Sequence, residues 1–266
     1  MSPLPCLLAV DAGNTSVTVG LFQGRRLARV GRLATAAALG RGGLGARLAS
    51  CVGLGSPRGP VAAVVFASVV PALDRKLSAA AQDRFRCPVF AVTPRSRLGL
   101  PLAVKAPAEV GADRIVNALA ARELVGAPSL VVDIGTAVTV DCVTEAGAYG
   151  GGAIMPGPGM AVDALRDHTA KLPYVEPRRV SRAIGRDTAE CIRSGLYFGW
   201  LGMIRAVVEK TRSEMGGGRI PVIATGGWAR LFRSGLGPDF CIMPDLTLEG
   251  LRLAYGILAG GGTRCR

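Results

Sequence analysis

The chain has 266 residues, of which 49% are hydrophobic and 37 are glycine, so it can bury a sizeable core and is expected to be a compact α/β protein. No apolar run approaches the roughly 18 residues of a membrane span, and the first residues lack the basic start of a signal peptide, so we expect neither. The formal net charge of +13 attracts polyanions, but the basic residues are spread along the chain and only 5% of residues are aromatic. We therefore expect a solvated, Arg-rich surface, and binding of nucleic acid is not expected.

The first half of the chain is predicted to form strands, followed by helix and strand in alternation. Apolar or alternating runs predict strands at 5–11, 15–22, 25–33, 61–70 and 88–92. A helix is expected at 73–81, after Pro71 has ended the fourth strand. Residues 40–60 are rich in Gly and Arg and predict no element.

The second half repeats this order after a helix expected at 115–125. Strands are expected at 130–133, 136–143, 148–154 and 221–224. Helices are expected from the Gly/Pro turn at 155–159 to about 169, at 188–215 and at 247–259. This order fits two halves, each a mixed sheet with helices on its faces, joined by a hinge near 113–129.

The strongest motif occurs twice. Residues 10–19 read Val-Asp-Ala-Gly-Asn-Thr-Ser-Val-Thr-Val, and residues 132–140 read Val-Asp-Ile-Gly-Thr-Ala-Val-Thr-Val. A glycine after a buried strand lets the backbone N–H groups of the turn approach a bulky anion. Asp11 can face a phosphate only with Mg²⁺ or water between them. One copy alone would also fit a plain hairpin with Asp as turn former, but two copies favour a shared ligand.

Two further segments carry chemistry. Gly111-Ala112-Asp113-Arg114 places an acid and a cation at a predicted helix start, where Asp113 can accept a proton from a hydroxyl and Arg114 can pair with a carboxylate. The same pattern is also typical of the charges at an ordinary helix N-terminus. Thr225-Gly226-Gly227 suits close approach by a purine or ribose, or is a plain glycine turn.

Cysteine and histidine usage excludes several kinds of site. The seven cysteines are scattered and form no Cys-x-x-Cys pair, which favours a reducing cytoplasm and argues against a disulfide framework or a zinc site. His168 is the only histidine, so a two-histidine metal site is impossible. We expect His168 to be a polar residue at a helix end.

Taken in order, these motifs resemble those of the type III pantothenate kinases, which belong to the acetate and sugar kinase/actin superfamily. The resemblance covers almost the whole chain and rests on segments 11–15, 68–71, 111–117, 133–139, 150–157, 169–173, 185–188 and 225–227. It implies an α/β fold of two ribonuclease-H-like (actin-like ATPase) domains, each a mixed sheet flanked by helices. The N-terminal domain with the first phosphate loop is expected at 1–115. The C-terminal domain, with the second phosphate loop and the adenosine turn, is expected at 116–266, and its last helix can pack back on the first domain.

The same resemblance implies ATP-dependent phosphorylation of pantothenate to 4′-phosphopantothenate, the first step of coenzyme A biosynthesis. Mg²⁺ would accompany ATP, and K⁺ or NH₄⁺ would be a second cofactor. Asp113 would be the general base. Pantothenate would be bound by Gly111, Ala112, Asp113, Arg114 and Thr188, with Thr188 reaching it from the partner subunit of a homodimer.

The remaining implied roles concern ATP and the metals. ATP and its phosphates would be bound by Asp11, Ala12, Gly13, Asn14, Thr15, Ser16, Val17, Thr18, Thr136, Gly226 and Gly227. Asp133 would hold the monovalent cation, and Asp11 would hold Mg²⁺ directly or through water.

Two alternatives stay open beside the kinase. One is a transcription accessory factor or DNA-binding regulator, which the presence of Asp11, Asp113, Asp133 and Thr136 argues against. The other is a kinase of the same superfamily for another small hydroxylated substrate. One departure from the family is expected to matter: Val104 stands where many members have Tyr, so a substrate hydrogen bond or lid contact should be missing.

Overall fold

The computed structural model describes residues 6–54 and 61–260 and divides the chain into two compact units. The first unit comprises residues up to 100, 105–120 and those from 246 onward, and the second comprises 101–104 and 121–245. Helix α4 (Ala112–Leu124) continues through the division at 120/121. The boundary expected after residue 115 falls inside the same helix.

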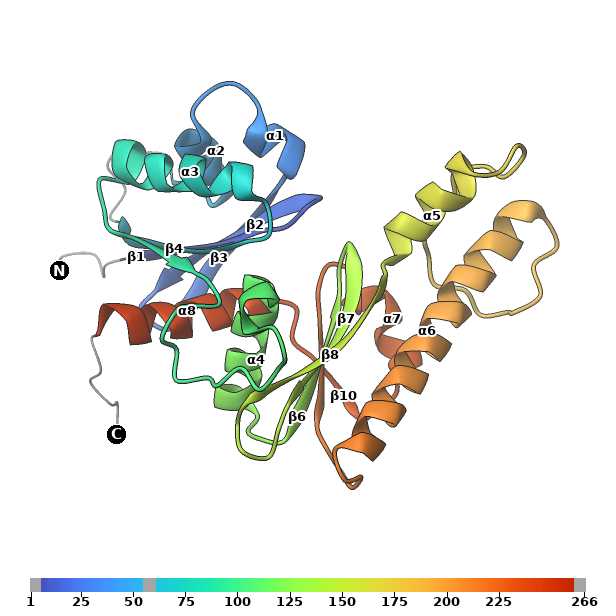
Figure 1. Cartoon of the computed structure of the whole chain (residues 1–266). Helices are drawn as coiled ribbons and strands as arrows, with labels where there is room; N and C mark the ends of the chain where they lie inside the picture. The colour runs from blue at the N-terminus through green and yellow to red at the C-terminus, as the bar shows by residue number, and fades with distance from the viewer. Residues whose placement is uncertain (1–5, 55–60, 261–266) are drawn as a thin grey trace. The chain divides into compact units, whose positions relative to one another are not determined.

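The first unit contains a five-stranded mixed sheet in the order β3-β2-β1-β4-β5 (Figure 1). Its strands are β1 (Cys6–Ala12), β2 (Ser16–Gln23), β3 (Arg26–Ala34), β4 (Val61–Ser68) and β5 (Val89–Val92). The first three run antiparallel to their neighbours, whereas β1, β4 and β5 are parallel. The carboxyl ends of the three parallel strands therefore meet at one edge of the sheet, the usual place for a ligand in an α/β fold.

Helices cover both faces of this sheet, as an apolar parallel core requires. One face packs against α1 (Thr35–Leu39), α2 (Leu44–Cys51) and α3 (Pro71–Ala80), which continues as a π-helical turn at Ala81–Phe85. The other face packs against α8 (Leu246–Ala259), which belongs to this unit although it ends the chain. Gly20 leaves room for this helix, because a Cβ there would lie 2.9 Å from Leu248.

The second unit repeats the same topology in the order β10-β9-β6-β7-β8 (Figure 1). Its strands are β6 (Ser129–Ile134), β7 (Ala137–Val143), β8 (Tyr149–Pro156), β9 (Val222–Thr225) and β10 (Phe240–Ile242). Here β6, β7 and β8 are antiparallel, and β6, β9 and β10 are parallel. The predicted fold class, two mixed sheets each flanked by helices, is confirmed.

Three helices cover one face of the second sheet: α5 (Pro158–Asp167), α6 (Thr188–Glu214) and α7 (Ala229–Leu236). The first turn of α6 forms a capping box, in which Asp187 accepts from the Glu190 N–H and the Glu190 carboxylate accepts from the Arg186 N–H, both at 2.8 Å. Alternate residues of the strands point to the opposite face, and this face carries the polar side chains Asp133, Thr139, Asp141 and Thr225 together with apolar Val131 and Ile223.

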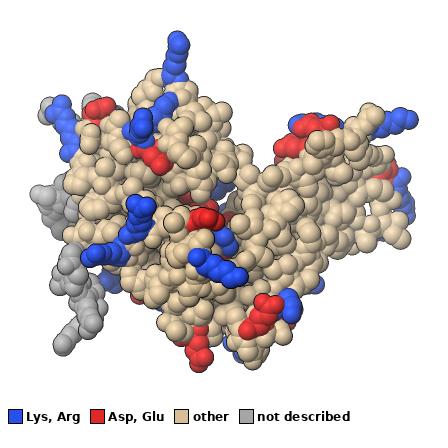
Figure 2. All heavy atoms as spheres, viewed as in Figure 1, with Lys and Arg blue, Asp and Glu red and all other residues tan. Residues whose placement is uncertain are grey.

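The charged side chains and the cysteines agree with a solvated, Arg-rich surface and with free thiols. Basic and acidic side chains are dispersed and interleaved on the face shown in Figure 2. The cysteines within residues 6–54 and 61–260 are all free, and Cys265 lies outside those ranges. Among the described residues, no helix combines the length and the apolar character needed to cross a membrane.

Candidate functional site

The first Asp-x-Gly motif forms the turn of the β1–β2 hairpin. Asp11 is half-buried near the end of β1 and pairs across the sheet with Thr18. The turn is closed by a hydrogen bond from the Gly13 N–H to the Ser16 carbonyl at 3.0 Å. Asn14 and Thr15 lie exposed at its tip. The tip is thus a polar loop held on a rigid hairpin.

Two anchors hold this loop in place. The buried Thr35 hydroxyl donates to the Gly13 carbonyl at 2.6 Å, and the Thr35 N–H donates to the Thr15 carbonyl at 3.0 Å. Ala12 and Val17 point into the hydrophobic core. These two predicted ATP-binding residues can therefore contribute only backbone groups to a ligand, whereas the side chains of Asn14 and Thr15 are accessible.

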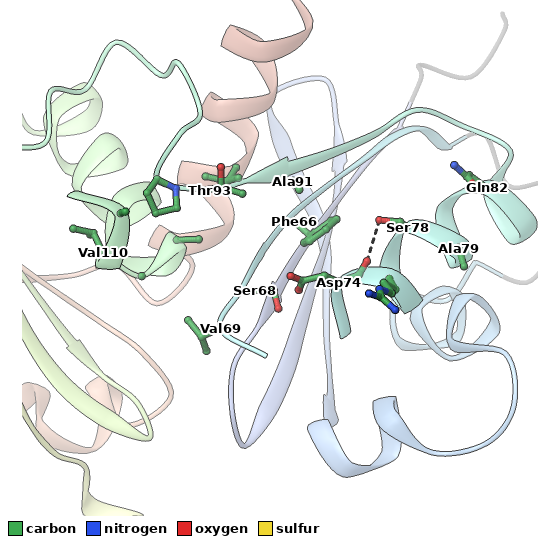
Figure 3. Close-up of a pocket in the computed structure, with 16 residues that line it drawn as sticks. Phe66, Ser68, Val69, Asp74, Ser78, Ala79, Gln82, Ala91, Thr93 and Val110 are labelled. Carbon is green, nitrogen blue, oxygen red and sulfur yellow. Dashed lines mark hydrogen bonds between the residues drawn. The ribbon is translucent and has the colours of Figure 1, made fainter. Parts of the chain in front are cut away.

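A cavity of about 610 Å³ opens at the carboxyl ends of β4 and β5 (Figure 3). Ser68 and Val69 line it where β4 ends, and Thr93 lines it where β5 ends. Helix α3 adds the polar side chains of Asp74, Arg75, Ser78 and Gln82. Gly111 and Ala112 complete the wall, so the predicted substrate segment borders this cavity within the first unit.

Asp113 lies at the second position of α4, directly beside that wall. A Cβ at Gly111 would collide with the Asp113 carboxylate and would lie 3.8 Å from Val69, so the glycine lets the carboxylate pack against the wall. Burial raises the pKa of Asp113 above its ordinary value, and the N–H and charge of Arg114 offset this only in part. The Arg114 N–H donates to the carboxylate at 2.8 Å. A carboxylate with a raised pKa is a stronger base, which suits removal of a proton from a hydroxyl.

The second Asp-x-Gly motif ends β6 and forms a shorter turn. The Gly135 N–H donates to the Ala137 carbonyl at 3.0 Å, and Thr136 is exposed at the tip. Gly157 packs against this turn, and its N–H donates to the Thr136 carbonyl at 3.0 Å. A Cβ at Gly157 would collide with the Gly135 and Thr136 carbonyls. The close packing fixes the loop from behind and leaves Thr136 accessible.

The predicted adenosine turn packs directly on Asp133. Gly226 has a φ of +90°, and a Cβ there would collide with the Asp133 carboxylate and the Ile134 carbonyl. Gly227 is exposed, and the Trp228 N–H donates to the Ile134 carbonyl at 3.0 Å. Thr136, Asp133 and the glycine turn therefore lie together within the second unit.

Thr188 lies on a helix, far along the sequence from the loops described above. It is exposed at the first position of α6, next to the Asp187 cap. The nearby Ile184 has 84% of its surface exposed.

The donor groups fit the two implied metals in different ways. Within the described residues no cluster of three or more His, Cys, Asp or Glu side chains could hold a metal ion. A single carboxylate such as Asp11 suits Mg²⁺, which keeps several waters and is bound chiefly by substrate phosphates. Asp133 has threonines as register partners on both sides, Thr139 and Thr225. Oxygen donors with one negative charge suit a monovalent cation.

One group at this site was missed by sequence reasoning. Asp141 is fully buried, and its carboxylate accepts from the Thr139 hydroxyl at 2.8 Å and from the Tyr149 hydroxyl at 2.9 Å. The available signal was a lone acid inside the apolar run Val-Thr-Val-Asp-Cys-Val. A buried acid needs hydrogen-bond partners, so its position marks a polar network.

Each of the two mixed sheets has a glycine hairpin at the end of its first strand, and the first unit adds a half-buried acid beside a cavity. The chain belongs to the type III pantothenate kinase family, whose model matches residues 7–210. It is 42% identical over 256 residues to the type III pantothenate kinase of Moorella thermoacetica, with 94% of this chain and 98% of that protein covered. It is 43% identical over 251 residues to the one of Thermomicrobium roseum, covering 94% and 96%.

Solved structures share the fold at much lower identity. A structure described as a putative Baf family transcriptional activator from Campylobacter jejuni matches with a TM-score of 0.60 at 17% identity, covering 93% of this chain and 96% of that one. Component A of (R)-2-hydroxyglutaryl-CoA dehydratase from Acidaminococcus fermentans matches with a TM-score of 0.57 at 15% identity, covering 94% and 96%. These likenesses establish the fold alone, and the family membership does not favour a DNA-binding regulator.

Proposed function

We propose that the protein transfers the γ-phosphoryl group of ATP to the primary hydroxyl of pantothenate, which starts coenzyme A biosynthesis. The observation that carries this proposal is Asp113, a half-buried acid of raised pKa beside a cavity at the carboxyl ends of parallel strands. Membership of the type III pantothenate kinase family supports the choice of substrate.

The reaction needs a base and precise placement rather than covalent help from the protein. Asp113 accepts the proton of the pantothenate hydroxyl as the oxygen attacks the γ-phosphorus. The new P–O bond forms while the bond from that phosphorus to the bridging oxygen of ADP breaks, so the products are the phosphate ester, ADP and the proton. Gly111, Ala112 and Arg114 line the acceptor side, and the Arg114 guanidinium pairs with the substrate carboxylate.

The two hairpin loops hold the nucleotide. The backbone N–H groups and the accessible side chains from Asp11 to Thr18 bind the phosphates, and Asp11 would hold Mg²⁺ directly or through water. Thr136, Gly226 and Gly227 bind ATP, because the glycines allow the backbone to approach a flat purine or ribose. Asp133 would hold a monovalent cation, K⁺ or NH₄⁺, which would supply positive charge.

The enzyme acts as a homodimer in this proposal, with Thr188 of one subunit reaching the pantothenate of the other. The second unit exposes large apolar side chains that a partner can cover: Ile154, Met160, Tyr174, Ile184, Phe198 and Met203. Apolar side chains of this kind would form an interaction surface if they gather in one patch. The free thiols of the described cysteines suit a reducing cytoplasm.

The direct experiment is ADP release from ATP, Mg²⁺ and pantothenate, with K⁺, NH₄⁺ and Na⁺ compared at constant ionic strength. We expect pantothenate-dependent turnover that K⁺ or NH₄⁺ stimulates. Turnover of a sugar together with no turnover of pantothenate would show that the acceptor is another hydroxylated molecule.

The dimer is tested by mixing two inactive variants. Asp113→Asn and Thr188→Ala each impair every site of their own homodimer. In a mixed dimer, one site combines the intact Asp113 of one subunit with the intact Thr188 of the other. Activity should therefore reappear when the variants are unfolded and refolded together. A mixture that stays inactive while light scattering shows dimers would exclude a contribution of Thr188 across the interface.

A further inference from the structure

Asp133 is flanked by a threonine on each side in the second sheet. Thr139 of β7 is its antiparallel register partner, and Thr225 of β9 is its parallel partner. Register partners in adjacent strands project to the same face, with Cβ atoms about 5 Å apart. Two hydroxyl groups therefore stand on either side of one carboxylate, on the polar face of the sheet.

The hydrogens of both hydroxyls are donated away from Asp133. Thr139 donates to the Asp141 carboxylate at 2.8 Å, and Thr225 donates to the Pro244 carbonyl at 3.4 Å. A hydroxyl has one hydrogen and two lone pairs. With its hydrogen directed elsewhere, each hydroxyl can act toward the Asp133 side only as an acceptor. Three oxygens that present lone pairs attract a cation rather than a hydrogen-bonded anion.

Asp141 fixes this polarity on the Thr139 side. It is fully buried two residues along the same strand, so it lies on the same face, and Tyr149 holds its second oxygen at 2.9 Å. Each of its two oxygens therefore has one hydroxyl donor. Thr139 can turn its hydrogen toward Asp133 only by leaving a buried oxygen of Asp141 without this donor, which is unfavourable.

We propose that the hydroxyl oxygens of Thr139 and Thr225 bind the monovalent cation together with Asp133, and that Asp141 is a positioning residue that keeps the Thr139 lone pairs directed at it. The inference rests on the cation proposed above for Asp133. Hard cations are bound by carboxylate, hydroxyl and carbonyl oxygens, and one carboxylate among neutral oxygens balances a single positive charge.

The main test compares Thr139→Val, which keeps the shape of the side chain and removes its oxygen, with Thr139→Ser, which keeps the oxygen. Two properties are measured in K⁺ against choline at equal ionic strength: the rise in melting temperature with ADP present, and the K⁺ concentration for half-maximal turnover. We expect Thr139→Val to lose most of the K⁺-dependent rise and to need at least ~10-fold more K⁺. Thr139→Ser should stay close to the wild type, and Thr225→Val should shift in the same direction as Thr139→Val.

Two controls separate cation binding from a loosened hairpin. Tyr149→Phe removes the other donor to Asp141 and should lower the melting temperature in choline while leaving the K⁺ response within about twofold, because Thr139 keeps its bond. Thr144→Val removes a hydroxyl from the turn of the same hairpin and should change neither property. An equal loss of K⁺ response in Tyr149→Phe and Thr139→Val would overturn the inference.

The outcomes also distinguish this inference from the proposed function. A wild type that K⁺ activates and stabilises, with an unchanged response in Thr139→Val, would refute the threonine ligands and leave the kinase intact. If K⁺ stabilises the wild type but the protein does not phosphorylate pantothenate, the proposed substrate is refuted. The threonine ligands are then still decided by the melting comparison of Thr139→Val and Thr139→Ser.

Discussion

Asp11 and Asp133 occupy equivalent places in two equivalent sheets, yet the threonines opposite them are used in contrasting ways. Thr18, opposite Asp11, accepts a hydrogen bond from the Arg32 guanidinium at 3.3 Å. Thr139, opposite Asp133, instead donates to a buried carboxylate. A positive group beside the first loop favours an anion such as phosphate, whereas a carboxylate beside the second favours a cation. One duplicated motif thus supports two opposite electrostatic tasks.

The contrast continues at the neighbouring register positions. Ala67 lies beside Asp11 in β4 where Thr225 lies beside Asp133 in β9. Two register pairs further from the loop, on the same face, the first sheet has Gly20 where the second has Asp141. In the first unit, Leu248 of α8 occupies the space next to Gly20 that corresponds to the Asp141 side chain in the second unit. We therefore propose that the strands behind the repeated loop, rather than the loop itself, determine which charge it binds.

The largest effect should come from a residue in neither copy. Asp113→Asn removes the proposed base, so kcat should fall by about 10³-fold. The affinity for ATP, measured by calorimetry, should stay unchanged, because neither loop is altered. A variant that retains most of its turnover would place the base on one of the two repeated aspartates and undo the division of tasks.

The pH dependence follows from the raised pKa of the same residue. Protonated Asp113 cannot accept a proton, so kcat/KM should fall tenfold per pH unit below a midpoint that lies above the ordinary value of 3.8. A raised folded-state pKa also means that stability is lost as pH rises through it. Asp113→Asn should therefore melt no lower than the wild type at pH 8, and should lack the acid limb in its residual rate.

The next effect separates the two copies directly. Asp11→Asn should lower turnover by about 10²-fold at every K⁺ concentration, because it acts through the phosphates and Mg²⁺. Turnover of Asp133→Asn should fall by a similar factor at low K⁺ and should be partly restored at high K⁺. Titration of both variants with Mg²⁺ and with K⁺ checks this. Identical titrations for the two variants would mean that the copies share one task.

Much of this comparison could be predicted from the sequence. Apolar and alternating runs located the strands around both aspartates because buried strands have a clear pattern. Helices α1 and α2 were missed, because Gly40, Gly42 and Gly43 interrupt the pattern. They are stabilised by packing on the sheet, as at Gly31, where a Cβ would collide with Cys51.

The loops of the candidate site could be predicted from the sequence, but the side chains that surround them could not. Asp11, Asp113 and Asp133 stand in recognisable motifs, whereas the roles of Thr139 and Asp141 depend on strand register and on the direction of one hydroxyl hydrogen. Register is set by long-range pairing, which a local pattern does not specify. The sequence led us to expect a hinge near 113–129, and the two units divide at 120/121 inside the continuous helix α4.

A smaller effect concerns the glycines behind each loop. Gly226 has a positive φ and no room for a Cβ beside Asp133, so Gly226→Ala should lower the free energy of unfolding by about 2 kcal/mol or more. Gly13 has no positive φ, and a Cβ there would lie 3.2 Å from the Ser16 carbonyl, so Gly13→Ala should lose about 1 kcal/mol or less. Urea denaturation measures both. Equal losses would show that the second loop is no more tightly packed than the first.

The smallest effect concerns Val104, at the position where the family resemblance led us to expect Tyr. Its segment is held beside β8, since the Ala103 N–H donates to the Tyr149 carbonyl and the Tyr149 N–H to the Pro101 carbonyl, both at 2.9 Å. A regained hydroxyl adds one hydrogen bond of about 1 kcal/mol, so Val104→Tyr should lower the KM for pantothenate about fivefold. The kcat should not change, because the contact is equal in the ground and transition states. Val104→Phe supplies the ring without the hydroxyl, and an equal gain in that variant would assign the effect to packing alone.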